Sequence, residues 1–93
     1  MWTFVNTLGI IPATMSLTHT EQLRAARSMA GITQAELAER SGVSLPTIKR
    51  LELGQGPLGV RLDTLQKLQR ALEASGVIFI AENGDGPGVR LRK

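Results

Sequence analysis

The feature that most constrains the fold is a pair of short helical segments joined at a glycine, between residues 33 and 54. Thr33 and Glu36 form a capping box, in which a hydroxyl and a carboxylate three residues later satisfy free amides at a helix start. The helix that follows is expected over residues 34–41, and Gly42 supplies the left-handed residue that ends it. Ser44 then caps a second helix that runs to about residue 53. Two such helices across a tight turn are typical of a helix-turn-helix.

The small and apolar residues of the two segments indicate how these helices pack. Ala38 is small, which lets the helices cross closely, and Gly42 provides the corner between them. The remaining apolar side chains are expected to form the wedge that sets the crossing angle; they are Leu37, Val43, Ile48 and Leu51. Each residue alone indicates little, but together with two caps in register they indicate the motif strongly.

Two further helices flank this pair. Thr18 and Glu21 form another capping-box pattern, which predicts a helix that stops at Gly31. Leucines at helical spacing predict a last helix over residues 62–75, closed by Gly76; they are Leu62, Leu65, Leu68 and Leu72. We therefore expect a mainly α, four-helix domain over residues 18–76.

The C-terminal segment, residues 77–93, changes to β-type patterning. Residues 77–81 form a β-prone run, residues 83–88 are rich in turn residues and residues 89–92 alternate, which predicts a β-hairpin. An isolated two-stranded hairpin is marginal in water and needs a surface to pack on. Either two tails join in one sheet, which makes a homodimer through residues 77–93, or the hairpin folds back over its own helices. The first is preferred because a chain of 93 residues has little other surface for strands.

Residues 1–17 show neither a helical nor a strand period, and we interpret them as a flexible N-terminal arm. Met15 is an alternative to Met1 as the start of translation. The sequence does not distinguish between the two starts.

Composition narrows the function. The chain has no cysteine and one histidine, His19, so neither a thiol nucleophile nor a metal or other cofactor is expected. No nucleotide-binding glycine loop lies in a βαβ context, and we expect no enzyme. The apolar runs are too short to span a membrane, and with no cysteine and no export signal the bacterial or phage cytoplasm is the expected location. A net charge of +3 permits an anionic partner, but the placement of the charges has to identify it.

The central residues resemble the phage-repressor, or XRE-type, family of helix-turn-helix regulators. The matching stretches are Leu-Arg-Ala-Ala-Arg at residues 23–27, Gly-Ile-Thr-Gln-Ala-Glu-Leu-Ala at residues 31–38, Gly-Val-Ser at residues 42–44 and Ile-Lys-Arg-Leu-Glu at residues 48–52. The resemblance covers roughly residues 20–76. It implies that double-stranded DNA is the partner and that the third helix lies in its major groove.

The resemblance also implies roles for individual residues. Base readout is expected from Ser44, Thr47 and Arg50, since the planar guanidinium of Arg50 can donate two hydrogen bonds to guanine. Phosphate contacts are expected from Gln34, Lys49 and Gln55.

Arg27 and Glu52 match the family's partly buried ion pair, which contributes to stability rather than to DNA contact. Three residues depart from the family pattern. Leu45 and Pro46 stand where well-known repressors have glutamines, and Leu53 stands where many members have asparagine. These departures concentrate the expected base readout on Thr47 and Arg50.

The expected function is a sequence-specific transcriptional regulator, a repressor that binds a pseudo-palindromic operator as a dimer. The alternative is a protein-interaction module of the antitoxin type, which neutralises a partner protein and regulates its own gene through DNA binding. Neither residues 1–17 nor residues 77–93 exclude a protein partner.

Overall fold

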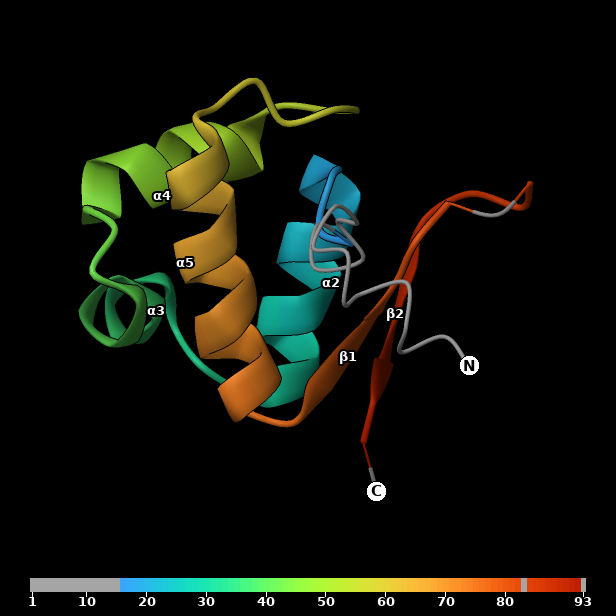
Figure 1. Ribbon diagram of the computed structural model, residues 1–93. Coiled ribbons are helices and arrows are strands. Elements are labelled where there is room, and N and C mark those ends of the chain that lie inside the picture. Colours follow the sequence, from blue (N-terminus) through green and yellow to red (C-terminus); the bar gives the residue numbers. More distant parts are fainter. Residues whose placement is uncertain (1–15, 83, 93) are drawn as a thin grey trace.

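The computed structural model describes residues 16–82 and 84–92, which form four helices and one antiparallel hairpin. The elements are α2 (Thr20–Ala30), α3 (Gln34–Ser41), α4 (Leu45–Leu53), α5 (Leu62–Ala74), β1 (Val77–Ile80) and β2 (Gly88–Leu91). Figure 1 shows α3 and α4 on one side of the molecule, the hairpin on the other, and α2 and α5 between them. The mainly α fold with a C-terminal hairpin is confirmed.

The two caps and the glycine corner of the central pair form as expected. The hydroxyl of Thr33 accepts the Glu36 amide at 3.0 Å, and the Glu36 carboxylate accepts the Thr33 amide at 2.8 Å. Gly42 ends α3 with φ +81°, a left-handed conformation that a side chain at this position would strain. The hydroxyl of Ser44 accepts the Thr47 amide at 3.3 Å and starts α4.

The expected cap of the first helix is wrong. The N-cap of α2 is His19, one residue after Thr18, and the residue that reaches back is Gln22 rather than Glu21. The side-chain oxygen of Gln22 accepts the amides of Thr18 at 2.8 Å and His19 at 3.0 Å. Two capping patterns overlap here, offset by one residue, and local sequence cannot rank them. Contacts from elsewhere decide, because the Glu21 carboxylate accepts the amide of Gly56 instead, at 3.2 Å.

A single apolar core joins all the helices to the hairpin. The wedge residues of α3 and α4 are all buried, together with residues of α2, α5 and β1; the buried apolar set is Leu17, Leu23, Ala26, Ile32, Leu37, Val43, Ile48, Leu51, Leu68, Ala71, Leu72, Val77 and Phe79. This core fixes the position of α4.

The folded domain extends further toward the N-terminus than expected. Leu17 is fully buried, and its amide donates to the side-chain oxygen of Gln69 at 2.8 Å. The domain therefore includes Leu17 instead of starting at Thr18. The rest of the expected arm, apart from Ser16, lies outside the described residues, as does Met15.

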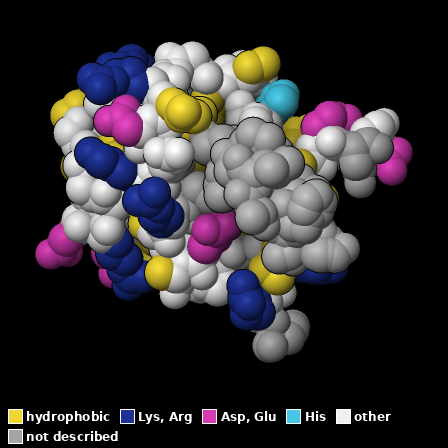
Figure 2. All heavy atoms as spheres, in the orientation of Figure 1, with side chains coloured by type: hydrophobic (Ala, Val, Ile, Leu, Met, Phe, Trp, Pro, Cys, Tyr) yellow, Lys and Arg dark blue, Asp and Glu magenta, His cyan; other side chains and the backbone are white. Residues whose placement is uncertain are grey.

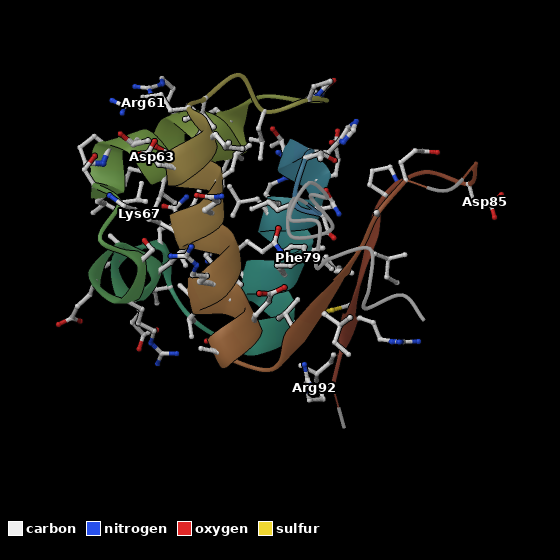
Figure 3. All side chains as sticks on the ribbon, viewed as in Figure 1. Arg61, Asp63, Lys67, Phe79, Asp85 and Arg92 are labelled. Carbon is white, nitrogen blue, oxygen red and sulfur yellow. The ribbon has the colours of Figure 1, made fainter. Side chains whose placement is uncertain are left out.

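The hairpin packs on its own chain. β1 and β2 pair with Val77 opposite Leu91 and Phe79 opposite Val89. Val77 and Phe79 are buried, and Figure 3 shows Phe79 pointing from the sheet toward the helices. The helices α2 and α5 thus give the strands a surface to pack on within the same chain. The sequence argument for a shared sheet assumed that no such surface was available, so that argument does not hold.

Candidate nucleic-acid interface

Helix α4 presents a polar and basic face to solvent. Its buried side consists of Ile48, Leu51 and Glu52, which anchor the helix to the domain. Lys49 and Arg50 are exposed; the helical period places Arg50 opposite the buried side and Lys49 beside it. Because the anchoring residues and the cations come from one short helix, the position of both cations is set by the core.

The first turn of α4 holds the other two residues expected to read bases. The hydroxyl of Ser44 donates to the hydroxyl oxygen of Thr47 at 2.8 Å, in addition to capping the helix. The structure therefore brings Ser44 and Thr47 together. Thr47 also shares a groove with Arg50, so three of the expected contact residues lie on one continuous surface.

That groove is open and has a volume of about 750 Å³. Thr47 and Arg50 form its α4 side, and residues 58–61 with Thr64 form the other side. Arg61 adds a second exposed cation to the groove, beside Arg50. Its Nε lies 3.3 Å from the exposed carboxylate of Asp63, and Figure 3 shows both residues at the start of α5. The sequence analysis missed Arg61. The length of the loop between α4 and α5 does not indicate which of its side chains lies next to α4.

The loop that follows α4 is tied to the N-terminal end of α2. The amide of Leu58 donates to the Thr18 carbonyl at 2.9 Å, and the Thr20 amide donates to the Gly56 carbonyl at 2.9 Å. Hydrogen bonds from its own backbone amide and from that of Gly56 hold the pKa of the Glu21 carboxylate below its ordinary value. Gln55, an expected phosphate contact, is exposed next to these tethers.

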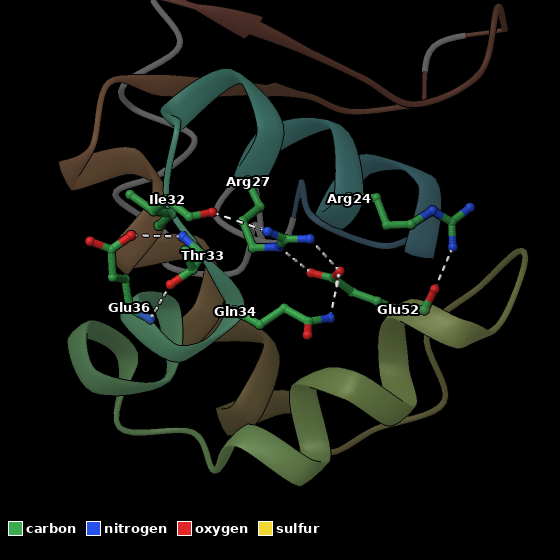
Figure 4. Close-up of polar contacts among 7 residues, drawn as sticks. All are labelled: Arg24, Arg27, Ile32, Thr33, Gln34, Glu36 and Glu52. Carbon is green, nitrogen blue, oxygen red and sulfur yellow. Dashed lines mark hydrogen bonds and ion pairs between the residues drawn. The ribbon is translucent and has the colours of Figure 1, made fainter.

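A partly buried ion pair connects α2 to the end of α4. Nε and Nη2 of Arg27 donate to the Glu52 carboxylate at 2.8 and 2.9 Å (Figure 4). The hydrogen bonds to Glu52 raise the pKa of the Arg27 guanidinium. The third guanidinium nitrogen of Arg27, Nη1, donates to the Ile32 carbonyl at 3.0 Å, which adds the α2–α3 connection to the same network.

The same carboxylate binds Gln34. The side-chain nitrogen of Gln34 donates to Oε1 of Glu52 at 3.0 Å (Figure 4). This bond uses one of the two amide protons and leaves the other available to a ligand. The structure thus joins an expected phosphate contact to the expected ion pair, a link that the sequence analysis did not foresee.

Arg24 was also missed. The guanidinium nitrogen Nη1 of Arg24 donates to the backbone carbonyls of Glu52 and Gly54, at 2.6 and 3.0 Å. These carbonyls lie at the C-terminal end of α4, where a cation is favourable because the helix leaves acceptors unpaired. Arg24 therefore fixes the end of the helix that carries Lys49 and Arg50.

The remaining surface carries mixed charge. Figure 2 shows Lys and Arg side chains over the part formed by α3 and α5, with Asp and Glu side chains between them. Among residues 16–82 and 84–92, no group of three or more His, Asp or Glu side chains could hold a metal ion. No helix in these ranges is long and apolar enough to cross a membrane.

Comparison with known families gives a match to most of the folded part of the chain. A family model described as Helix-turn-helix matches residues 23–79, which includes all of α3, α4 and α5 and most of α2. A comparison with curated proteins finds no match. The family match covers more than half of the 93 residues.

Proposed function

Because the chain belongs to the phage-repressor-like, or XRE-type, helix-turn-helix family of DNA-binding regulators, we propose that it is a sequence-specific repressor that inserts α4 into the major groove. The observation that carries the proposal is the exposed pair Lys49 and Arg50, on a helix whose opposite side is buried and whose two ends are held by Ser44 and Arg24. A helix held in one position can direct Arg50 toward a base edge and Lys49 toward a phosphate.

Base readout is assigned to Arg50, Thr47 and Ser44. The guanidinium of Arg50 can donate to O6 and N7 of one guanine, and a good bidentate contact discriminates against the wrong base by about 1–3 kcal/mol. Thr47 offers a methyl group and a hydroxyl to the same groove. Ser44 retains acceptor capacity, although its hydroxyl already bonds Thr47.

Phosphate contacts are assigned to Gln34, Lys49 and Gln55, with Arg61 as an addition suggested by its position on the groove. Gln34 is the first residue of α3, where free backbone amides attract an anion. Its side chain is already oriented by Glu52, so its remaining amide proton can donate to a phosphate with little further loss of freedom.

Two copies are proposed to bind a pseudo-palindromic operator. The recognition helices then lie about 34 Å apart, one turn of DNA, or a multiple of that distance. Repression follows from the same geometry, because a bound dimer blocks access to the duplex it covers. The contact between the copies belongs to this proposal as well: residues 77–93 are its candidate segment, through contacts other than strand pairing at the outer edge of β2.

The experiment is selection of binding sites from random duplex DNA, followed by affinity measurements at two salt concentrations. An enriched palindrome, with an affinity that falls steeply as salt rises, supports a dimeric operator reader. No enrichment from a folded protein contradicts it. An enriched single half-site would support base readout by α4 but contradict the dimer.

A further inference from the structure

We propose that the outer edge of β2 binds an extended, acidic peptide segment of a partner protein by adding it as a third strand to the hairpin. The proposal concerns the side of the molecule away from α4 and does not depend on DNA binding. It rests on the hydrogen-bond pattern of the hairpin, on the rigidity of its attachment and on the charges that β2 carries.

The ladder shows which backbone groups of β2 point outward. Arg92 donates its amide to the Gly76 carbonyl, at 2.6 Å, so these two residues form a hydrogen-bonded pair. In an antiparallel ladder such pairs alternate with pairs that make no mutual bonds. Given the register, Arg90 opposite Ile78 is bonded, whereas Leu91 opposite Val77 and Val89 opposite Phe79 are not. The amides and carbonyls of Val89 and Leu91 therefore point away from β1.

This edge is open within the part of the chain that the structure describes. No third strand pairs with the hairpin there, and the outward groups of Val89 and Leu91 make no hydrogen bond with another described residue. The register of β2 runs without a bulge or a proline, the devices that commonly prevent strand addition. Figure 1 shows β2 on the outside of the fold, with β1 between it and α5.

The hairpin is held rigidly, which lowers the entropic cost of adding a strand. The side-chain nitrogen of Gln22 donates to the Gly88 carbonyl at 3.0 Å and ties the hairpin to α2. In the connecting loop, the Glu82 carboxylate accepts the amides of Gly84 and Gly86, each at 3.0 Å. The template strand is thus formed before any partner arrives.

The charges identify the partner as acidic. Arg90 in β2 and Arg92, which directly follows the strand and continues its ladder to Gly76, stand at alternate positions, so they lie on the same face, and both are exposed. Neither forms an ion pair with an acidic residue elsewhere in residues 16–82 and 84–92. Figure 3 shows Arg92 at the free end of the hairpin. An added strand with carboxylates at alternate positions places them beside the guanidinium groups, a favourable cross-strand pair.

Two other occupants fit this edge less well. A second copy of β2 would bring arginines next to arginines, which is unfavourable across a ladder. The DNA held by α4 is on the other side of the molecule, since α2 and α5 separate the hairpin from α3 and α4 (Figure 1). An acidic strand is therefore the occupant that both the backbone pattern and the charge favour.

The test uses a blocked peptide, Thr-Val-Glu-Val-Glu-Val-Thr, titrated into the full chain and followed by calorimetry and backbone amide NMR shifts. The expected result is saturable binding with the largest shifts at Val89 and Leu91. A peptide with lysine in place of glutamate is expected to bind at least tenfold more weakly. A glutamate peptide with alternate amides methylated on nitrogen should fail to bind.

Two variants locate the site. Arg90→Glu with Arg92→Glu is expected to exchange the preference, so that the lysine peptide binds more tightly than the glutamate peptide. The control is Lys67→Glu with Arg70→Glu, the same charge change on α5, which should leave the preference intact. Leu91→Pro removes one outward amide without breaking a β1–β2 bond and should weaken binding at least tenfold, with melting temperature as the check on folding.

The outcomes against the proposal are equally defined. It is overturned if no peptide binds at millimolar concentration, or if the charge reversal on β2 acts no differently from that on α5. It is also overturned if the free protein is a dimer that Leu91→Pro converts to a monomer, because the edge is then occupied by a second copy. Operator affinity, measured on the same samples, reports on the DNA-binding proposal separately.

Discussion

The ion pair between Arg27 and Glu52 should be the most sensitive single point in the domain. The Glu52 side chain is only 6% exposed, and its carboxylate accepts three hydrogen bonds, two from Arg27 and one from Gln34. Replacing Arg27 by methionine removes two of these donors and leaves a buried carboxylate with one. Removing one partner of a buried pair costs about 3–5 kcal/mol, and we expect Arg27→Met to fall in this range.

The reverse substitution should cost less. The Arg27 side chain is 25% exposed and keeps its bond to the Ile32 carbonyl at 3.0 Å. After Glu52→Leu the unpaired cation therefore remains partly hydrated, and we expect a loss of about 2–3 kcal/mol. The double variant replaces both charges by apolar side chains of similar size. The loss of unfolding free energy in the double variant should be smaller than the sum of the two single losses by at least about 2 kcal/mol.

Urea unfolding of the four proteins measures this coupling, provided that the slope of the transition is constant across the set. A small domain has a total stability of about 5–15 kcal/mol, so a loss of about 3–5 kcal/mol can leave Arg27→Met partly unfolded without denaturant. In that case the same concentration of a stabilising osmolyte is added to all four samples. Single losses below about 1 kcal/mol, or losses that simply add in the double variant, would refute the assignment of this pair as a buried, coupled unit.

The other predictions concern the core, the cap and the corner. Leu17→Ala should lower the unfolding free energy by about 2–5 kcal/mol because the side chain is fully buried. The control Leu53→Ala, at an exposed position, should change it by less than about 0.5 kcal/mol. Equal urea midpoints for the two variants would contradict the inclusion of Leu17 in the folded domain. Hydrogen bonds from the backbone amide and the hydroxyl of Thr33 lower the pKa of Glu36 from 4.5. The ionised carboxylate therefore stabilises the fold above pH 4.5, and this contribution is lost as the pH falls below that value. The stability difference between wild type and Glu36→Gln should shrink over that range, and a difference independent of pH would exclude the cap. Gly42→Ala should cost about 1–2 kcal/mol because φ is +81°, and Gly59→Ala, without such a φ and with open space around it, should be nearly neutral in the same urea assay.

Local signals predicted the elements around α3 and α4 well. The caps at Thr33 and Ser44 and the corner at Gly42 depend on residues within a few positions of each other, so the chemistry that forms them can be read directly from the sequence. The hydrophobic spacing of α5 is a signal of the same local kind.

Long-range polar contacts could not be predicted in this way. Gln22 bonds backbone groups near the start of α2 and also the Gly88 carbonyl, 66 residues away. Arg24 bonds carbonyls 28 and 30 residues away. Neither residue differs in local pattern from an ordinary polar residue on a helix surface, because its partners become neighbours only after folding.

The candidate site shows the same division. Exposure of Lys49 and Arg50 follows from the helical period that buries Ile48 and Leu51. The position of Arg61 on the opposite side of the groove depends on the path of the loop, which is set by tethers to residues 18–21. That information lies in tertiary contacts and not in the α4 sequence.

The most direct test of the central claim is the ratio of affinities for a selected operator and for random duplex DNA, measured for Arg50→Ala and for Arg70→Ala. Both substitutions remove one exposed arginine, but only Arg50 lies on α4. The account predicts that Arg50→Ala lowers the ratio by about 5- to 150-fold, the equivalent of about 1–3 kcal/mol, and that Arg70→Ala leaves it unchanged. A full ratio retained by Arg50→Ala would contradict base readout by α4.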